Sequence, residues 1–224
     1  MRSLSTWVVG FVLALVVVGT AVLPLTGPGF TRALSGRFSL AAEAGLPPER
    51  MLEVAEQVRA FVVTADADSL PATVDGRSGF DGSAVSHLID VRRVLNAARL
   101  FTGLLTALVT IWIALELARK RPRRIADALR AGSILAVAFV ALAAAIAVLD
   151  FEWFFTAFHG LFFRSGTWTF AFDSLLIQTF PEPFWVTCGA AWAALTVLSA
   201  GVLLGLARLL TAPQGTRPAG PAGG

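Results

Sequence analysis

Four apolar stretches, each long enough to cross a membrane, constrain the fold of this chain more than any other feature. They cover residues 7–25, 100–117, 131–149 and 185–206. A hydrocarbon core of roughly 30 Å takes about 20 helical residues, and lipid accepts only segments whose backbone polar groups are satisfied internally. We therefore expect an all-α integral membrane protein, with four transmembrane helices in one membrane domain over residues 1–206.

The first apolar stretch also has to be weighed against a signal peptide. It runs for nineteen residues from Trp7 to Leu25, whereas a cleavable signal has an apolar centre of about 7–15 residues followed by a small-x-small cleavage site. The sequence VLPLTGPGF that ends this stretch offers no clean site of that kind. We therefore interpret it as an uncleaved first helix.

Charge predicts the orientation of the four helices. The loop 118–130 has six basic residues and one acidic residue, which is typical of a cytoplasmic loop. Residues 26–98 carry nine acidic residues against seven arginines, and residues 150–184 carry four against one. We expect the segments 26–99 and 150–184 to be extracytoplasmic and both termini to be cytoplasmic. Because the basic residues gather at membrane boundaries, the net charge of +3 does not indicate a nucleic-acid partner. A second role for the basic loop would be binding anionic lipid head groups.

The extracytoplasmic segment 26–99 is too long for a bare connector. Apolar residues repeat at helical spacing from Met51 to Val62, which predicts an amphipathic helix. A stretch rich in Asp, Gly, Ser and Pro then predicts turns over residues 64–83. The helical pattern resumes near Ser86 and runs into the second span, so we expect one long helix that projects above the bilayer. The Pro- and Gly-rich tail 207–224 is predicted to be disordered.

The segment Phe151–Trp185 contains thirteen of the 23 aromatic side chains of the chain. Single ionisable or proline residues interrupt it, so it is not a usable span. Aromatic rings concentrate at the boundary between lipid tails and water. We therefore expect an aromatic-rich interfacial segment outside the transmembrane helices.

His87 and His159 are the only histidines, and the predicted topology brings both to the extracytoplasmic membrane boundary. Asp90 lies three residues after His87 on the same helix face, where its carboxylate would hold one ring nitrogen and leave the other free as a base. The chain has no Gly-x-Ser-x-Gly elbow, and Cys188 has no nearby cation that would favour a thiolate, so a Ser or Cys acyl-enzyme is not expected. From these residues alone, two histidines binding a metal ion with Asp90 or Asp173, or ligating a haem, stay open.

Two motifs resemble the lipoprotein intramolecular transacylase (Lit) family. The first is His87-Leu88-Ile89-Asp90-Val91-Arg92, which is similar to the family's His-Leu/Met-x-Asp-Val-basic motif. The second keeps the family's order and spacing and comprises Phe158-His159, Phe162-Phe163, Trp168-Thr169-Phe170, Asp173, Leu176-Ile177 and Phe180-Pro181. The likeness extends from residue 7 to about residue 206.

The resemblance implies an enzyme of the bacterial cytoplasmic membrane whose active site faces the extracytoplasmic side. Such enzymes move the sn-2 acyl chain of a diacylglyceryl-modified lipoprotein cysteine to the α-amino group of that cysteine, leaving an N-acyl lyso-form lipoprotein. The partners would be such lipoproteins and membrane lipid, and we expect no cofactor and no metal ion. The resemblance also implies that His87 and His159 are the catalytic residues.

The chemistry of the reaction agrees with two histidines, because an amine that attacks an ester needs a base for its proton and an acid for the leaving alkoxide. We expect Asp90, Arg164, Trp168 and Asp173 to support the pair by orienting the histidines or anchoring polar parts of the lipid. Two alternatives remain from the sequence, namely a non-catalytic membrane subunit and a haem- or metal-binding redox protein.

Overall fold

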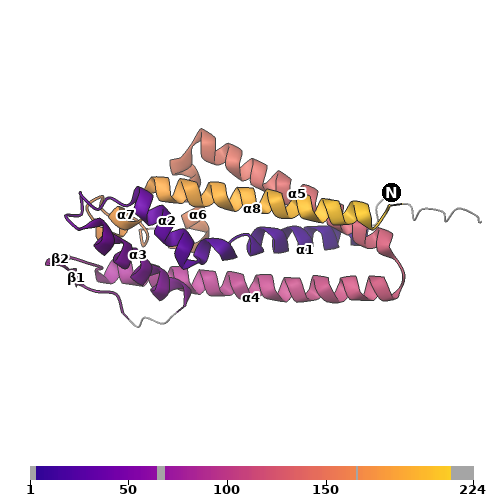
Figure 1. The fold of residues 1–224 in the computed structure, drawn as a ribbon, viewed down its shortest axis with the longest axis horizontal. Helices are drawn as coiled ribbons and strands as arrows, with labels where there is room; N and C mark the ends of the chain where they lie inside the picture. The colour runs from indigo at the N-terminus through magenta and orange to yellow at the C-terminus, as the bar shows by residue number, and fades with distance from the viewer. Residues whose placement is uncertain (1–3, 65–68, 165, 213–224) are drawn as a thin grey trace, which may run out of the picture.

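A computed structural model describes residues 4–64, 69–164 and 166–212 of the chain (Figure 1). Nearly all of its regular structure is helical. In chain order the elements are α1 (Leu4–Thr20), the 3-10 helix η1 (Leu23–Thr26), α2 (Pro28–Phe38), α3 (Pro48–Val63), β1 (Thr73–Val74), β2 (Arg77–Ser78), α4 (Gly82–Ala118), α5 (Pro122–Leu149), α6 (Phe151–Phe162), α7 (Leu175–Thr179) and α8 (Glu182–Leu209). The prediction of a mostly helical fold is confirmed.

Within the described residues, four helical segments are long and apolar enough to cross a membrane, as the sequence predicts. They are α1 with η1, α4, α5 and α8, which lie side by side along the long axis of the molecule (Figure 1). Helix α1 packs mainly on α5 and α4, and α5 packs on α8. Leu104, Leu108 and Ile111 of α4 are each more than half exposed and recur at helical spacing. Such an apolar outer face suits contact with lipid tails.

Small residues set the distance between α1 and α5. A Cβ atom placed on Gly132 would lie 2.9 Å from the carbonyl oxygen of Gly10, and one placed on Gly10 would lie 2.7 Å from the Cβ of Ala131. The two backbones therefore approach too closely for a side chain at either glycine. Close approach through small residues is a common way for membrane helices to associate, because lipid tails are as apolar as the side chains.

Helix α4 is one continuous helix of 37 residues. At 1.5 Å per residue it is about 55 Å long, well beyond a hydrocarbon core of roughly 30 Å. Asp81 caps its first turn, since its carboxylate accepts a hydrogen bond from the backbone N–H of Ala84 at 2.8 Å. The predicted helix that continues beyond the second span is thus present, and it carries His87 away from the apolar half of α4.

The prediction of a loop over residues 118–130 is wrong for most of its length. Helix α5 begins at Pro122, so only three residues separate it from α4. Proline suits the first helical turn, where no N–H donor is required, and Arg, Ala and Leu after it are good helix formers. Two basic residues near this connection contact the buried carboxylate of Glu116, namely Arg119 at 3.3 Å and Arg124 at 3.2 Å.

Elements outside the four long helices form a second core. The predicted amphipathic helix is confirmed as α3, whose apolar face, including Met51, Val54 and Phe61, is buried. This face packs with residues of α2, α4, α7 and the start of α8 in one hydrophobic cluster. The predicted turn region contains the short hairpin β1–β2, with Asp75 and Gly76 at positive φ between the strands. Asp-Gly is a favoured pair for such a turn because both central residues need positive φ.

The two ends of the molecule differ. The start of α1, the α4–α5 connection and the end of α8 lie at one end, whereas α2, α3, α6, α7 and the hairpin lie toward the other (Figure 1). Of the tail predicted to be disordered, residues 207–209 belong to α8, and residues 213–224 lie outside the described part of the chain.

Candidate functional site

The aromatic segment folds back across the end of the bundle that carries the hairpin. Asp150 ends α5 and caps α6, because its carboxylate accepts a hydrogen bond from the backbone N–H of Trp153 at 2.9 Å. After α6 the chain runs without regular helix until Ser174 caps α7, and Pro181 then precedes α8. The capped turns at Asp150 and Ser174 thus divide the aromatic segment into α6, a loop and α7, and ring contacts with His87 hold the end of α6 and the loop against α4.

This arrangement brings the two histidines together. His87 lies in the second turn of α4 and His159 in the last turn of α6, 72 residues later in the chain. Their ring centroids are 6.2 Å apart and the ring planes are inclined by 27°. His87 is buried, with 8% of its surface exposed, and His159 is partly buried. Two imidazolium cations at this distance would repel one another, so the pair favours a form with at most one positive charge.

The hydrogen bonding of His159 defines its tautomer. Its Nδ1 lies 2.8 Å from the carbonyl oxygen of Phe155, one helical turn earlier. A carbonyl only accepts, so Nδ1 carries the proton and donates it. The lone pair of the neutral ring is then on Nε2. Burial lowers the pKa of His159 below its usual value near 6.5, while the hydrogen bond to Phe155 acts in the opposite direction. The ring is therefore a neutral base near pH 7.

Aromatic rings enclose both imidazoles, and we call this group the aromatic cage. The ring centroids of Phe155, Trp168 and Phe163 lie 4.0, 4.8 and 5.6 Å from that of His159, and those of Phe163 and Phe170 lie 4.9 and 5.5 Å from that of His87. Phe163 thus contacts both histidines. An apolar enclosure lowers the local dielectric and strengthens any hydrogen bond or charge interaction inside it.

Two polar atoms inside the cage have no hydrogen-bond partner among the described residues. They are Nδ1 of His87 and Nε1 of Trp168, and both are buried. A buried N–H or ring nitrogen without a partner costs about 1–3 kcal/mol, and each such group in a native protein calls for an explanation. Their position beside His159 marks the cage as a place where a polar group of a substrate would find partners.

Asp90 does not hold His87 as expected. Its carboxylate accepts a hydrogen bond from Arg93 at 2.9 Å, and these two residues form an exposed ion pair. His87 and Arg93 are each three residues from Asp90 on the same helix. The carboxylate pairs with the guanidinium of Arg93 instead of the imidazole of His87. The guanidinium is always charged, so its charge-assisted hydrogen bond is stronger than one from a neutral imidazole.

Of the other predicted supporting residues, one lies in the cage and two have exposed side chains. Trp168 lies in the cage against His159. The side chains of Arg164 and Asp173 are exposed. Asp173 takes part through its backbone, since its carbonyl oxygen accepts a hydrogen bond from Arg77 at 3.1 Å. No hydrogen bond or ion pair joins either exposed side chain to the imidazole pair among the described residues.

Arg77 is a site-region residue that sequence reasoning missed. From the hairpin it donates to the carbonyl oxygen of Ala44 at 2.6 Å and to Oε1 of the buried Gln178 at 2.9 Å, in addition to Asp173. It thereby joins three segments that are far apart in the chain. No local signal could have found it, because its partners are mostly carbonyl oxygens that only the folded chain brings close.

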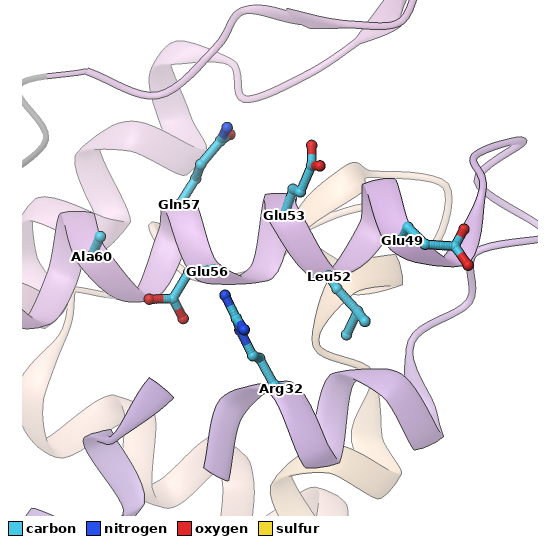
Figure 2. Close-up of a pocket in the computed structure, with 7 residues that line it drawn as sticks. All are labelled: Arg32, Glu49, Leu52, Glu53, Glu56, Gln57 and Ala60. Carbon is cyan, nitrogen blue, oxygen red and sulfur yellow. The ribbon is translucent and has the colours of Figure 1, made fainter. Parts of the chain in front are cut away.

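The described residues form at least two pockets. The larger, of about 520 Å³, lies between α2 and α3 and contains neither histidine. Figure 2 shows Arg32 of α2 reaching toward Glu56 of α3 there. Hydrogen bonding by Arg59 is the main cause that lowers the pKa of Glu56, and the charge of Arg32 adds to it. This pocket is a charged surface groove away from the cage.

The smaller pocket, of about 360 Å³, adjoins His87, and we call it the outer pocket. Its lining includes Ala84, one turn before His87 on α4, and Phe170, whose ring contacts His87. Across the described residues, no group of three or more His, Cys, Asp or Glu side chains is arranged to hold a metal ion. The arrangement as a whole suits proton transfer by two imidazoles in an apolar enclosure, next to a polar opening.

Comparison with known proteins agrees with these features. The family model described as lipoprotein intramolecular transacylase Lit matches residues 6–185. No curated protein matches the chain significantly. The solved structure of the membrane integral lipoprotein intramolecular transacylase Lit from Bacillus cereus is 18% identical and superposes with a TM-score of 0.76, covering 92% of this chain and 93% of that chain.

Two mutant structures of the same Bacillus cereus protein also match. One carries a histidine-to-arginine mutation and gives a TM-score of 0.72 at 17% identity, covering 92% of this chain and 89% of that chain. The other carries a histidine-to-alanine mutation and gives 0.65 at 18% identity, covering 92% and 91%. These likenesses show a shared fold, and the family match extends over most of the sequence. The chain therefore belongs to the lipoprotein intramolecular transacylase Lit family and is a membrane-integral acyltransferase that modifies lipoproteins.

Proposed function

We propose that this protein moves the sn-2 acyl chain of a diacylglyceryl-modified lipoprotein cysteine to the α-amino group of the same cysteine, with His87 and His159 as the catalytic pair and no acyl-enzyme. The observation that carries this proposal is the pairing of the only two histidines, 6.2 Å apart inside an apolar cage. Family membership favours an enzyme over the non-catalytic and redox alternatives that the sequence left open.

His159 is the base. Its Nδ1–H is engaged by Phe155, so Nε2 presents the lone pair, and burial keeps the ring neutral. The α-amine attacks the carbonyl carbon of the sn-2 ester, and Nε2 takes the proton that the nitrogen loses. The C–N bond of an amide forms as the C–O bond of the ester breaks. The proton returns to the glyceryl oxygen, which leaves as a hydroxyl, so the reaction needs no other reactant.

His87 and Trp168 stabilise the oxygen atoms that gain charge in this step. His87 donates an N–H hydrogen bond toward the leaving glyceryl oxygen, and the proton itself comes back from Nε2 of His159. The N–H of Trp168 donates to the former carbonyl oxygen in the tetrahedral intermediate. The support for this role is the buried, unpartnered Nε1 of Trp168 beside the ring of His159. A donor in an apolar site contributes strongly because little water competes for the developing charge.

The cage lies on the extracytoplasmic side of the membrane in this proposal, with both chain ends cytoplasmic. Its support is that the basic α4–α5 connection lies at the opposite end of the molecule from α6 (Figure 1). Lysine and arginine collect in cytoplasmic segments. Acyl chains would then lie among the exposed rings of α6, such as Phe158 and Phe162, at the level of the ester.

The test uses the fact that an intramolecular transfer changes no mass. A bacterial host that leaves its lipoproteins diacylated is given the wild-type protein, and the amino-terminal lipopeptides are analysed by tandem mass spectrometry with and without an amine-reactive label. We expect an unchanged intact mass, loss of labelling, and fragments with one acyl group on the cysteine nitrogen. A lipopeptide that still takes the label would refute the proposal, and the protein with His87 and His159 both replaced by Asn serves as the inactive control.

A further inference from the structure

The outer pocket opens to the surface beside the aromatic cage. Its floor is apolar, formed by the buried residues Ala84, Leu175 and Leu176. Its rim is polar and includes Asp81 and Ser174. Hydrogen bonds, first from the backbone N–H of Ala84 and then from the hydroxyl of Ser83, lower the pKa of Asp81, so its carboxylate is charged. An apolar floor with hydrogen-bonding groups around it suits an extended peptide better than an acyl chain.

Hydrogen bonds within the protein fix the wall of the outer pocket. Arg77 lies in the lining, and its hydrogen bonds to Ala44, Gln178 and Asp173 tie the hairpin to the turn before α3, to α7 and to the loop before α7. The pocket is therefore formed before any ligand enters. A preformed site avoids part of the entropy cost of ordering on binding.

The outer pocket lies within a few residues' reach of the two histidines. Ala84 in its floor is three residues before His87, which is about 4.5 Å along a helix axis. An extended peptide advances about 3.3–3.6 Å per residue. If the cysteine lies at the histidines, the second residue after it reaches the pocket. A volume of 360 Å³ is at the lower end for ligand sites, which limits the contents to a short piece of chain.

We propose that the outer pocket binds the first two or three residues of the polypeptide that follows the lipidated cysteine. The inference rests on the proposed function and adds a second recognition element to it. The acyl chains keep the substrate in the membrane, and the pocket fixes the direction in which the peptide leaves the cage. This would place the α-amine on the side of the cysteine that faces the histidines.

The test compares substrates of increasing length. The purified full-length protein in phospholipid vesicles is given diacylglyceryl-cysteine as its carboxamide, or followed by one, two or three alanines. We expect KM, in mole fraction of lipid, to fall with each of the first residues and to be at least tenfold lower for the longest substrate than for the carboxamide. An equal KM for all lengths would overturn the pocket while leaving the transacylase standing, and conversion of none of them would overturn both.

Variants that fill the pocket provide the second arm. Ala171→Trp and Ser78→Trp place a large ring in the lining from two different segments. Each should raise KM for the three-alanine substrate toward that of the carboxamide, so that the tenfold ratio disappears. Ala42→Trp is the matched control, because Ala42 is exposed and lies outside the pocket lining. The proposal fails if both filled variants keep the ratio of the wild-type protein, or if the Ala42 control loses it.

Discussion

The Nδ1–H of His159 donates a hydrogen bond to the carbonyl oxygen of Phe155 at 2.8 Å. Both residues belong to α6, so the helix that presents the imidazole also fixes its tautomer. The orientation of a catalytic histidine is often set by the partner of its second nitrogen. The sequence suggested a carboxylate, Asp90, as the orienting partner of His87, whereas the orienting partner of His159 is a backbone carbonyl.

Replacing His159 with Asn separates this structural hydrogen bond from catalysis. The Asn amide can still donate to the carbonyl oxygen of Phe155, but it has no basic lone pair at the position of Nε2. We expect the rate of lipopeptide conversion to fall by about 10²–10⁴-fold, with little change in the melting temperature in detergent. A variant that retains at least half of the wild-type rate would remove His159 from the base role.

The pH dependence should reflect the substrate amine before it reflects His159. An α-ammonium group has a pKa of about 7.7–8.0, and burial lowers the pKa of His159 below 6.5. As pH falls from 9, the rate should decline with unit slope once the amine is protonated. The slope should steepen only below about pH 6.5, where His159 also gains a proton. Initial rates measured from pH 5.5 to 9 check this, and a rate that rises on acidification would contradict it.

The N–H of Trp168 can be removed without removing its ring system. Incorporation of 3-benzothienylalanine replaces the indole N–H with sulfur and keeps the bicyclic shape. We expect kcat to fall about 10²–10³-fold, as for the loss of one oxyanion donor, with KM nearly unchanged. The same replacement at Trp153, which is largely exposed, is the control. If the sulfur analogue at position 168 leaves kcat at the wild-type value, the N–H has no catalytic role.

The sequence was sufficient for the four spans and for the long helix that carries His87, because hydrophobic length and helical spacing are local properties. The distribution of basic and acidic residues between the connecting segments also predicted that both histidines lie at the same membrane boundary. It could not predict their separation, since that depends on how α6 folds back after Asp150. Asp90 was assigned to His87 on spacing alone, and the spacing of Arg93 is the same. The contacts of Arg77 join residues up to 101 positions apart, which no local pattern encodes.

The contact between α1 and α5 should be sensitive to volume at Gly132. Leu at this position would meet the backbone of Gly10 and the side chain of Leu13. Overpacking costs about 1–3 kcal/mol, so we expect a clearly lower melting temperature in detergent. Gly201→Leu is the matched control, because a Cβ atom at this helical glycine would have no neighbouring atom within 4 Å. Equal melting temperatures for the two variants would show that the close approach is not required.

The most direct measurement of the central claim follows the acyl chain itself. Purified protein in vesicles is given a diacylglyceryl-cysteine lipopeptide with a deuterated acyl chain at sn-2 only, and the products are fragmented by mass spectrometry. We expect the deuterium to appear in the amide on the cysteine nitrogen, the glyceryl group to keep the unlabelled chain, and the His159→Asn protein to leave the label in place. Deuterium released as free fatty acid, or bound covalently to the protein, would contradict a direct transfer between two groups of the same substrate.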